Sequence, residues 1–350
     1  MFAFSTLLLA ATVALATPTK RFDGLSVELT SSAGKSLDSV SGLKVTAAVT
    51  NNNSEDVKIL KYGTVLDNLP TRSFAVTKDG KDVAFSGIKA NVRLSDSAYT
   101  TLKSGETVTV EHSLADVYDF SSAGTGKFSF AAVGDSLRVA GASDDVSDLK
   151  ALSKVSIDSK ALDIEITKDV ARPQRRATPD CSDSDKKSFI EGSYTEGKAL
   201  ASGASDYISS NSDSDLFNSY YSSNSASDVT AIFDAVANED DSSRTLSCED
   251  SQNACDGNVI AYTLISTTDI YFCDIFFDEV ETTELCGDVT VADRKIRGGT
   301  TLHEMTHATS ETDDVTYGCD ADQALSASEQ ISNADNFNCF STQVYADTKC

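Results

Sequence analysis

The sequence predicts an α+β protein, with a β-rich N-terminal half followed by a mainly helical half that carries a small β-sheet. Three observations support this class. Apolar and polar residues alternate along short segments between residues 21 and 165. Apolar residues recur at helical intervals through much of 177–350. Cysteine content and charge change between these two stretches, which indicates two structural units.

The first half reads as a series of short strands. Segments such as LSVELT, LKVTAAVT, RSFAVT and KFSFAAV alternate apolar and polar residues, and turn clusters such as NNNSED and KDGKD separate them. Short strands at this spacing predict an antiparallel β-sandwich of two layers. We interpret His112, in VEHSL, as a strand or core histidine rather than a metal ligand.

The second half reads as helices around a few strands. Helical spacing of apolar residues covers 186–210 and 225–239, with a loop and a short helix between them. NVIAYTL and DIYFCDIFF are rich in β-branched and aromatic residues, which predicts two strands. Two further helices are expected over 300–309 and 321–345.

The N-terminus predicts export. Residues 1–16 form a short apolar run closed by Ala14-Leu15-Ala16, typical of a signal peptide with its cleavage site. The run is shorter than the roughly 20 apolar residues that span a bilayer, and no later run is long enough. We therefore expect a secreted, extracellular protein with no membrane partner.

Cysteine usage agrees with export. All eight cysteines lie between Cys181 and Cys350. An even number confined to one half of an exported chain predicts a disulfide framework, although the count alone does not give the pairing. The sequence has no C-x-x-C pair, which argues against a cysteine-rich structural zinc site.

The charge is equally uneven. The chain has 29 basic and 54 acidic residues, a net charge of −25. Residues 177–350 contain about 8 basic and about 33 acidic residues, so this half carries the whole imbalance. Phosphate groups would be repelled, which excludes nucleic acid as a partner, whereas basic proteins would be attracted.

A processing site is expected between the halves. In KDVARPQRRATPDCS, Pro173 and Pro179 flank the dibasic pair Arg175-Arg176 in a stretch without apolar periodicity. Such a pair in an exposed linker of an exported protein is a natural cleavage site. We expect a propeptide over 17–176, removed after Arg176, and a mature domain over 177–350 that acts as a monomer.

The stretch TLHEMTHATSETDDVTYGCD holds two of the three histidines of the chain, His303 and His307. Residues four apart lie on one face of a helix, about 5–6 Å apart at Cβ, so both imidazoles can reach one zinc ion. Glu304 is placed beside the open coordination position, where it can act as a general base. This H-E-x-x-H pattern predicts a zinc-dependent peptidase.

Sequence spacing alone does not identify the third protein ligand of the metal. A metzincin pattern would place it at Asp313, but that pattern needs a glycine where this chain has Ser310. A thermolysin-like arrangement would take a glutamate from a later helix, for which Glu329 is available. Asp314, followed by Tyr317 and Gly318, is the remaining candidate.

The segments HEMTH, TDDVTYG and CDADQALSASEQISNADNF resemble the deuterolysin (aspzincin) family of secreted zinc endopeptidases. The resemblance implies a zincin-like catalytic domain in which His303, His307 and Asp314 bind Zn²⁺. It also implies that Glu304 is the general base and that Tyr317 stabilises the transition state. At Glu311 the chain departs from the glycine usual in the family.

The same resemblance implies four disulfide pairs and a substrate preference. The pairs are Cys181–Cys248, Cys255–Cys273, Cys286–Cys350 and an additional Cys319–Cys339. The implied substrates are proteins or peptides, with basic ones favoured, and the propeptide is a partner of the domain that it precedes. Because the propeptide lacks cysteine, a thiol–zinc switch cannot keep the enzyme latent.

Two other functions stay open. The H-E-x-x-H helix could serve a non-catalytic secreted protein with structural zinc, although such a site would need a fourth cysteine or histidine nearby. Alternatively, the N-terminal sandwich could be the functional part, as an adhesion or inhibitor module that stays attached.

Overall fold

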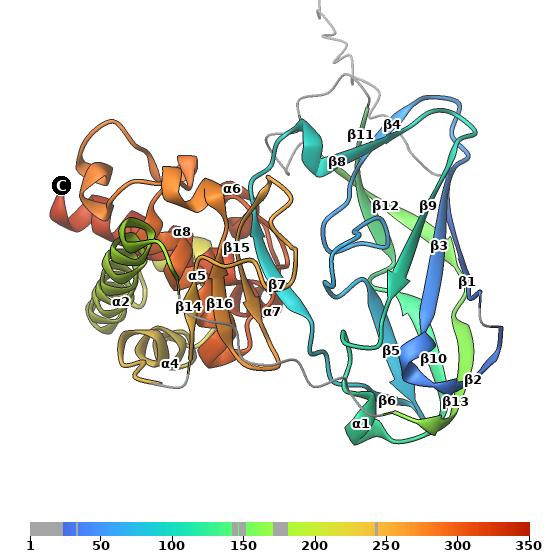
Figure 1. The fold of residues 1–350 in the computed structure, drawn as a ribbon. Coiled ribbons are helices and arrows are strands. Elements are labelled where there is room, and N and C mark those ends of the chain that lie inside the picture. The colour runs from blue at the N-terminus through green and yellow to red at the C-terminus, as the bar shows by residue number, and fades with distance from the viewer. Residues whose placement is uncertain (1–23, 33, 142–145, 147–151, 171–180, 242–243) are drawn as a thin grey trace, which may run out of the picture.

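The computed structural model describes residues 24–32, 34–141, 146, 152–170, 181–241 and 244–350. The signal peptide expected at 1–16 and the processing site expected at Arg175-Arg176 lie outside the described residues. Figure 1 shows a β-rich N-terminal half beside a helical C-terminal half, which confirms the α+β class.

Two sheets form the N-terminal half. The first has seven strands in the order β8-β4-β11-β12-β1-β3-β9. These strands are β1 (Leu25–Thr30), β3 (Lys44–Asn51), β4 (Val57–Leu60), β8 (Tyr99–Leu102), β9 (Thr107–Ser113), β11 (Ser136–Gly141) and β12 (Ser153–Ser159). The second sheet has the order β2-β13-β10-β5-β6. Its strands are β2 (Ser36–Ser39), β5 (Phe74–Lys78), β6 (Lys81–Asp82), β10 (Gly126–Ala132) and β13 (Leu162–Asp169).

The two sheets enclose one apolar core. Alternate residues of β3, such as Val45 and Val49, are buried together with Phe128 and Phe130 of β10. This alternation is what the sequence pattern predicts for a sandwich. The pairing departs from an all-antiparallel sandwich at two places, because β1 pairs with β12 and β2 with β13 in parallel.

Helices pack around a small sheet in the C-terminal half. The longer ones are α2 (Ser184–Asn211), α4 (Ala226–Ala237), α5 (Arg297–Ser310) and α8 (Ala334–Lys349), and α3 (Asp215–Tyr221) is the expected short helix. Their apolar faces bury Leu200, Phe233, Leu302 and Phe337 in a common core. The sheet has the order β14-β16-β15-β7. Its strands are β14 (Leu246–Ser247), β15 (Val259–Leu264), β16 (Asp269–Phe272) and β7 (Ile88–Val92).

The prediction of a single helix over 321–345 is wrong. The structure has α6 (Cys319–Gln323), α7 (Ala327–Ser332) and α8 in its place. Ser326 starts α7 with a capping box that includes Glu329. Asn333 is extended, with φ −90° and ψ 117°, and its side-chain oxygen accepts hydrogen bonds from the amides of Val315 and Thr316. These contacts with a distant loop break the helix.

Glycines bring α5 close to its neighbours. A Cβ added at Gly298 would lie 2.7 Å from Cβ of Glu196 on α2. One added at Gly299 would lie 2.2 Å from Oδ1 of Asn338 on α8. Because neither position has room for a methyl group, the RGG start of α5 allows close contact on both sides. The helix that carries both histidines of the motif is thereby fixed in the centre of the core.

All eight cysteines lie within the described residues and are paired. The bonds are Cys181–Cys248, Cys255–Cys273, Cys286–Cys350 and Cys319–Cys339. These are the pairs that the family resemblance implies, and each joins segments of the C-terminal half.

Strand β7 is the unexpected element. It lies in the sequence between two sandwich strands, yet it pairs antiparallel with β15 of the C-terminal half. Figure 1 shows it crossing the space between the two halves as the edge strand of the smaller sheet. The N-terminal half therefore contributes one strand to the sheet that lies against α5.

Candidate active site

Helix α5 places the two histidines of the motif side by side. His303 and His307 are one turn apart, with ring centroids 4.9 Å from each other and planes at 90°. Both side chains are buried, at 0% and 1% exposure. Two fully buried imidazoles side by side are unusual in a core and point to a ligand-binding role.

Asp314 completes a three-residue cluster. Its Oδ1 lies 2.9 Å from Nε2 of His303 and 3.2 Å from Nε2 of His307. The three side-chain atoms all lie within 4.8 Å of one another. Nε2 of His307 is buried and faces Asp314 without a well-aligned hydrogen bond. Two imidazole nitrogens and one carboxylate oxygen are a ligand set that suits zinc, so these residues could hold that metal.

The second nitrogen of each ring faces an acceptor. Nδ1 of His307 donates to the carbonyl of Thr312 over 2.7 Å. Nδ1 of His303 lies 3.5 Å from Oδ1 of Asp335, which is fully buried and paired with Arg294. Such partners fix the tautomer that leaves Nε2 free to bind a metal. Sequence reasoning identified neither Thr312 nor Asp335. Asp335 gave no distinct signal, because it falls inside the segment 321–345 that we expected to form one helix.

Burial and mutual charge interactions shift the pKa values of the two carboxyl groups at the site, those of Asp314 and Glu304. Burial alone would raise the pKa of the Asp314 carboxyl, but the facing His307 and His303 hold it well below its usual range. The carboxylate is therefore ionised and able to act as a ligand. Burial raises the pKa of Glu304, and the two histidines offset only part of this rise. Glu304 is thus a stronger base than an exposed glutamate.

The carboxylate of Glu304 is held through one of its two oxygens. Its Oε2 accepts a hydrogen bond of 2.7 Å from the hydroxyl of Thr263 on β15. Its Oε1 is buried and has no partner among the described residues. This arrangement fixes the carboxylate through one oxygen and leaves the other available for proton transfer.

Tyr317 approaches the same place from the loop after Asp314. Its hydroxyl donates to the backbone carbonyl of Ala90 on β7 over 2.6 Å. Burial and the nearby Asp314 raise the pKa of Tyr317 well above its usual value, so the hydroxyl stays protonated and can donate.

The other two candidate ligands point elsewhere. Oδ1 of Asp313 lies 2.8 Å from Nζ of Lys89 on β7. Glu329 accepts hydrogen bonds from the amide and hydroxyl of Ser326 in the capping box of α7. Neither residue belongs to the cluster that the structure brings together. A second group, Cys319, Asp322 and Cys339, is close enough to hold an ion, but its two sulfurs are bonded to each other.

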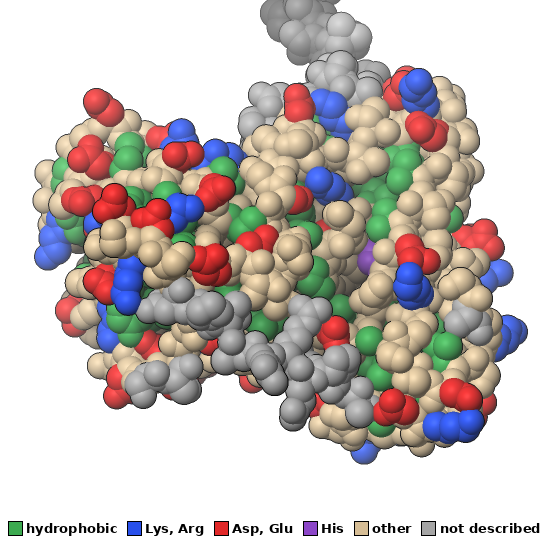
Figure 2. All heavy atoms as spheres, viewed as in Figure 1, with side chains coloured by type: hydrophobic (Ala, Val, Ile, Leu, Met, Phe, Trp, Pro, Cys, Tyr) green, Lys and Arg blue, Asp and Glu red, His purple; other side chains and the backbone are tan. Residues whose placement is uncertain are grey.

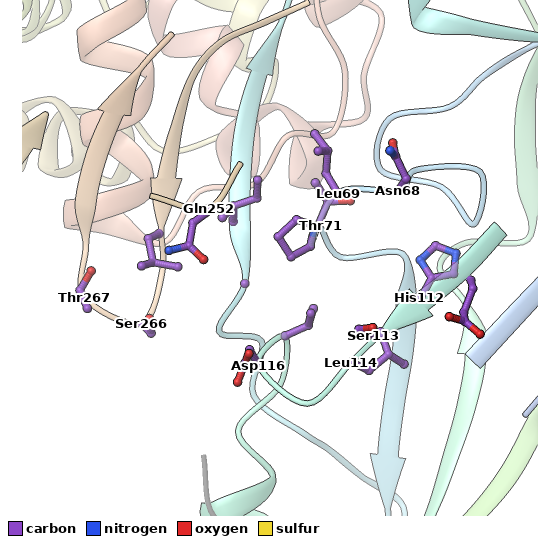
Figure 3. A pocket seen from close by; sticks show the side chains of 16 residues that line it. Asn68, Leu69, Thr71, His112, Ser113, Leu114, Asp116, Gln252, Ser266 and Thr267 are labelled. Carbon is purple, nitrogen blue, oxygen red and sulfur yellow. The ribbon is translucent and has the colours of Figure 1, made fainter. Parts of the chain in front are cut away.

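Two cavities border β7. One, of about 690 Å³, is lined by residues such as His112 and Thr71 from the N-terminal half and Gln252 from the other, and none of the histidine–aspartate cluster lines it. Figure 3 shows its labelled side chains coming from both halves around an open space. As expected, His112 has a core role: Nε2 lies 3.0 Å from the carbonyl of Val65. The other cavity, of about 480 Å³, is lined by Asp313, Asp314 and Tyr317.

A helical H-E-x-x-H segment, a buried histidine pair and an aspartate from the following loop define a metallopeptidase of the zincin type. The match to a family model identifies the family of metallopeptidases. The chain belongs to the deuterolysin metalloprotease (M35) family, whose model matches residues 2–350. This confirms the resemblance seen in the sequence and makes the chain a member of a family of metalloendopeptidases, for which proteins are the substrates.

Relatives match over nearly the whole chain. Penicillolysin of Penicillium citrinum is 31% identical over 88% of this chain and 90% of its own. A neutral protease 2 homologue of Sclerotinia sclerotiorum is 31% identical over 93% of this chain and 92% of its own. Among solved structures, a zinc peptidase from Grifola frondosa matches 46% of this chain and 96% of its own, with 19% identity and a TM-score of 0.38.

No helix within the described parts of the chain is long and apolar enough to cross a membrane. Figure 2 shows acidic side chains spread over the visible face of the helical half, with basic ones among them. The disulfide bonds all lie in this half.

Proposed function

We propose that the chain is a secreted zinc endopeptidase in which His303, His307 and Asp314 hold one Zn²⁺. When bound there, zinc lowers the pKa of a water molecule and polarises the peptide carbonyl. The observation that carries this proposal is the convergence of three ligand atoms within 4.8 Å of one another, with Glu304 fixed next to them.

The remaining residues of the site have separate roles. Glu304 takes the proton of the attacking water at Oε1 and passes it to the nitrogen of the leaving amine. Thr263 holds Oε2 of the same carboxylate and so keeps Oε1 in position. Tyr317 donates a hydrogen bond from its hydroxyl to the carbonyl oxygen as negative charge develops there. Its present hydrogen bond to a peptide carbonyl, that of Ala90, supports this role.

The precursor organisation is part of the proposal. Residues 1–16 direct export, 17–176 form a propeptide removed after Arg176, and 177–350 are the mature enzyme. The confinement of all eight paired cysteines to residues 181–350 supports this division. Basic substrates are favoured because the catalytic half carries the whole net charge of −25.

The two rival functions have less support. A structural zinc site would need a fourth cysteine or histidine, but every cysteine is in a disulfide and His112 bonds within the sandwich. If the N-terminal half were an adhesion module, its function would not explain why β7 lies at the histidine–aspartate cluster. The N-terminal sequence of the secreted protein decides this point, because a start near Ala177 contradicts a permanently attached module.

Replacing Glu304 with glutamine tests the mechanism. Glu304→Gln is expected to retain about one zinc per chain, while kcat/KM for casein falls by about 10²–10⁴-fold because the base is lost. Glu329→Gln is the matched control and should retain both zinc and activity, since its carboxylate only caps α7. Unchanged hydrolysis in Glu304→Gln would contradict the mechanism.

The same assay assigns the third ligand. Asp314→Ala is expected to lose zinc and activity together, because only two protein ligands remain. Asp313→Ala should keep its zinc, measured by atomic absorption after gel filtration. The reverse result would move the third ligand to Asp313.

A further inference from the structure

Strand β7 binds the C-terminal half as an added edge strand. Ile88, Lys89 and Ala90 pair antiparallel with Leu264, Thr263 and Tyr262 of β15. β15 is also the strand whose Thr263 holds Glu304. Addition of an extended segment to a sheet edge is a common mode of peptide recognition, because backbone hydrogen bonds bind the chain whatever its sequence. β7 therefore shows how a peptide can lie against this site.

The backbone of Ala90 is placed at the proposed catalytic groups. Its carbonyl accepts the hydrogen bond from Tyr317, and its N–H donates to Oδ2 of Asp314 over 2.9 Å. Tyr317 is the group proposed to bind the carbonyl oxygen of the bond that is cleaved. The Ala90–Asn91 peptide bond thus occupies the position of that bond, and Lys89 is the second residue on its N-terminal side.

The side chain of Lys89 fills a site suited to an ammonium group. Its Nζ lies 2.8 Å from Oδ1 of Asp313, and it donates to the carbonyls of Thr312 and Glu311 over 2.5 and 3.1 Å. These three acceptors match the three N–H donors of a lysine. The Lys89 side chain is only 11% exposed. We call the Asp313 carboxylate and these two carbonyls the ammonium pocket.

We infer that β7 lies in the substrate position, and that the ammonium pocket selects lysine at the second residue before the cleaved bond. This inference rests on the proposed function and deepens it by naming a substrate class. Asp313 is then a specificity-determining residue, next in sequence to a metal ligand. The attached N-terminal half also keeps substrates out, since its own strand occupies the edge of β15.

The placement of β7 is tested in the full chain with Glu304→Gln, so that hydrolysis plays no part. Hydrogen exchange of the segment 87–92 is followed by mass spectrometry. Lys89→Glu and Asp313→Lys are each expected to speed this exchange by about tenfold or more, because like charges then meet in the ammonium pocket. The double variant, with the charges exchanged, should return close to the starting rate. Unchanged exchange in both single variants would overturn the placement, and the restored double variant separates charge pairing from misfolding.

Selectivity is tested by peptide binding to the full chain with Lys89→Glu and Glu304→Gln, in which β7 is released. The probe is the labelled hexapeptide Gly-Ile-Lys-Ala-Asn-Val, compared with versions that have alanine or glutamate in place of its lysine. We expect about tenfold tighter binding of the lysine peptide by fluorescence anisotropy. Adding Asp313→Asn should remove the difference. Asp206→Asn, an exposed aspartate on α2, is the matched control and should preserve it.

Failures of the two proposals are distinguishable. Equal binding of the lysine and alanine peptides would overturn the inference, whether or not the wild-type protein is a peptidase. Absence of any hydrolysis by the zinc-loaded wild type would instead contradict the proposed function. The binding experiment would still decide whether the ammonium pocket selects lysine, because it does not depend on hydrolysis.

Discussion

At the scale of single residues, the loop after His307 distributes different tasks over adjacent positions. The carbonyl of Thr312 orients His307, Asp313 pairs with Lys89, and Asp314 faces both histidines. Neighbouring side chains of an extended segment point to opposite sides. Two aspartates that sequence spacing alone could not separate are therefore directed to two different places.

Glu311 carries local strain at the end of α5. Its φ of 57° and ψ of 24° are in the left-handed region, where a helix usually ends with glycine. We expect Glu311→Gly to raise the free energy of unfolding by about 0.5–1 kcal/mol, since the strain of about 1–2 kcal/mol exceeds the entropic cost of glycine. Urea unfolding measures this change.

Ser310→Gly is the matched control for Glu311→Gly. Ser310 is the last residue of α5, so glycine there should lower stability by up to about 1 kcal/mol. Stabilisation by both substitutions, or by neither, would contradict a strained conformation confined to Glu311.

At the scale of secondary-structure elements, the position of α5 depends on close helix contacts. A methyl group at Gly298 would meet Glu196 at 2.7 Å and the hydroxyl of Thr282 at 2.8 Å. Glu196 also bonds Thr282 and Arg297, so it has little freedom to move. We expect Gly298→Ala to lower the free energy of unfolding by about 1–3 kcal/mol, measured by urea denaturation.

Gly203 provides the comparison on α2. A Cβ there would have no heavy atom within 4 Å, so Gly203→Ala should instead stabilise the helix by about 0.5–1 kcal/mol. Equal effects of the two alanine substitutions would show that helix propensity, and not the contact between α2 and α5, decides stability.

The elements also show why part of the fold was predictable. α2 and α4 follow their apolar periodicity, because each buries one face, whereas α5 is buried on all sides from Gly298 to His307. The segment 321–345 has the same periodicity but is broken, since Asn333 bonds the amides of Val315 and Thr316 instead of continuing a helix. A local pattern does not contain that long-range contact.

At the scale of the whole molecule, the net charge is concentrated in the catalytic half. We expect a protamine-like basic protein to be cleaved with higher kcat/KM than an acidic protein at low salt, because the acidic half attracts it over long range. The preference should fall as ionic strength rises from about 0.01 to 1 M, where the Debye length shrinks from about 30 to 3 Å.

A short uncharged peptide is the control for this salt dependence. Its kcat/KM should stay nearly constant over the same range, because long-range attraction does not contribute. A preference for basic proteins that is insensitive to salt would contradict electrostatic steering, and would leave contacts such as the ammonium pocket as its source.

By itself, the sequence determined the chemistry of the site and the class of the fold. His303, Glu304 and His307 are spaced by the helical repeat, and short alternating segments encode the sandwich, so both follow from local geometry. Only the tertiary structure showed that Asp314 lies beside both histidines while Asp313 pairs with Lys89, and only it brought β7 to the edge of β15. The position of β7 depends on contacts between residues far apart in the sequence, such as Ala90 and Tyr317, which are 227 positions apart, and no sequence period records such contacts.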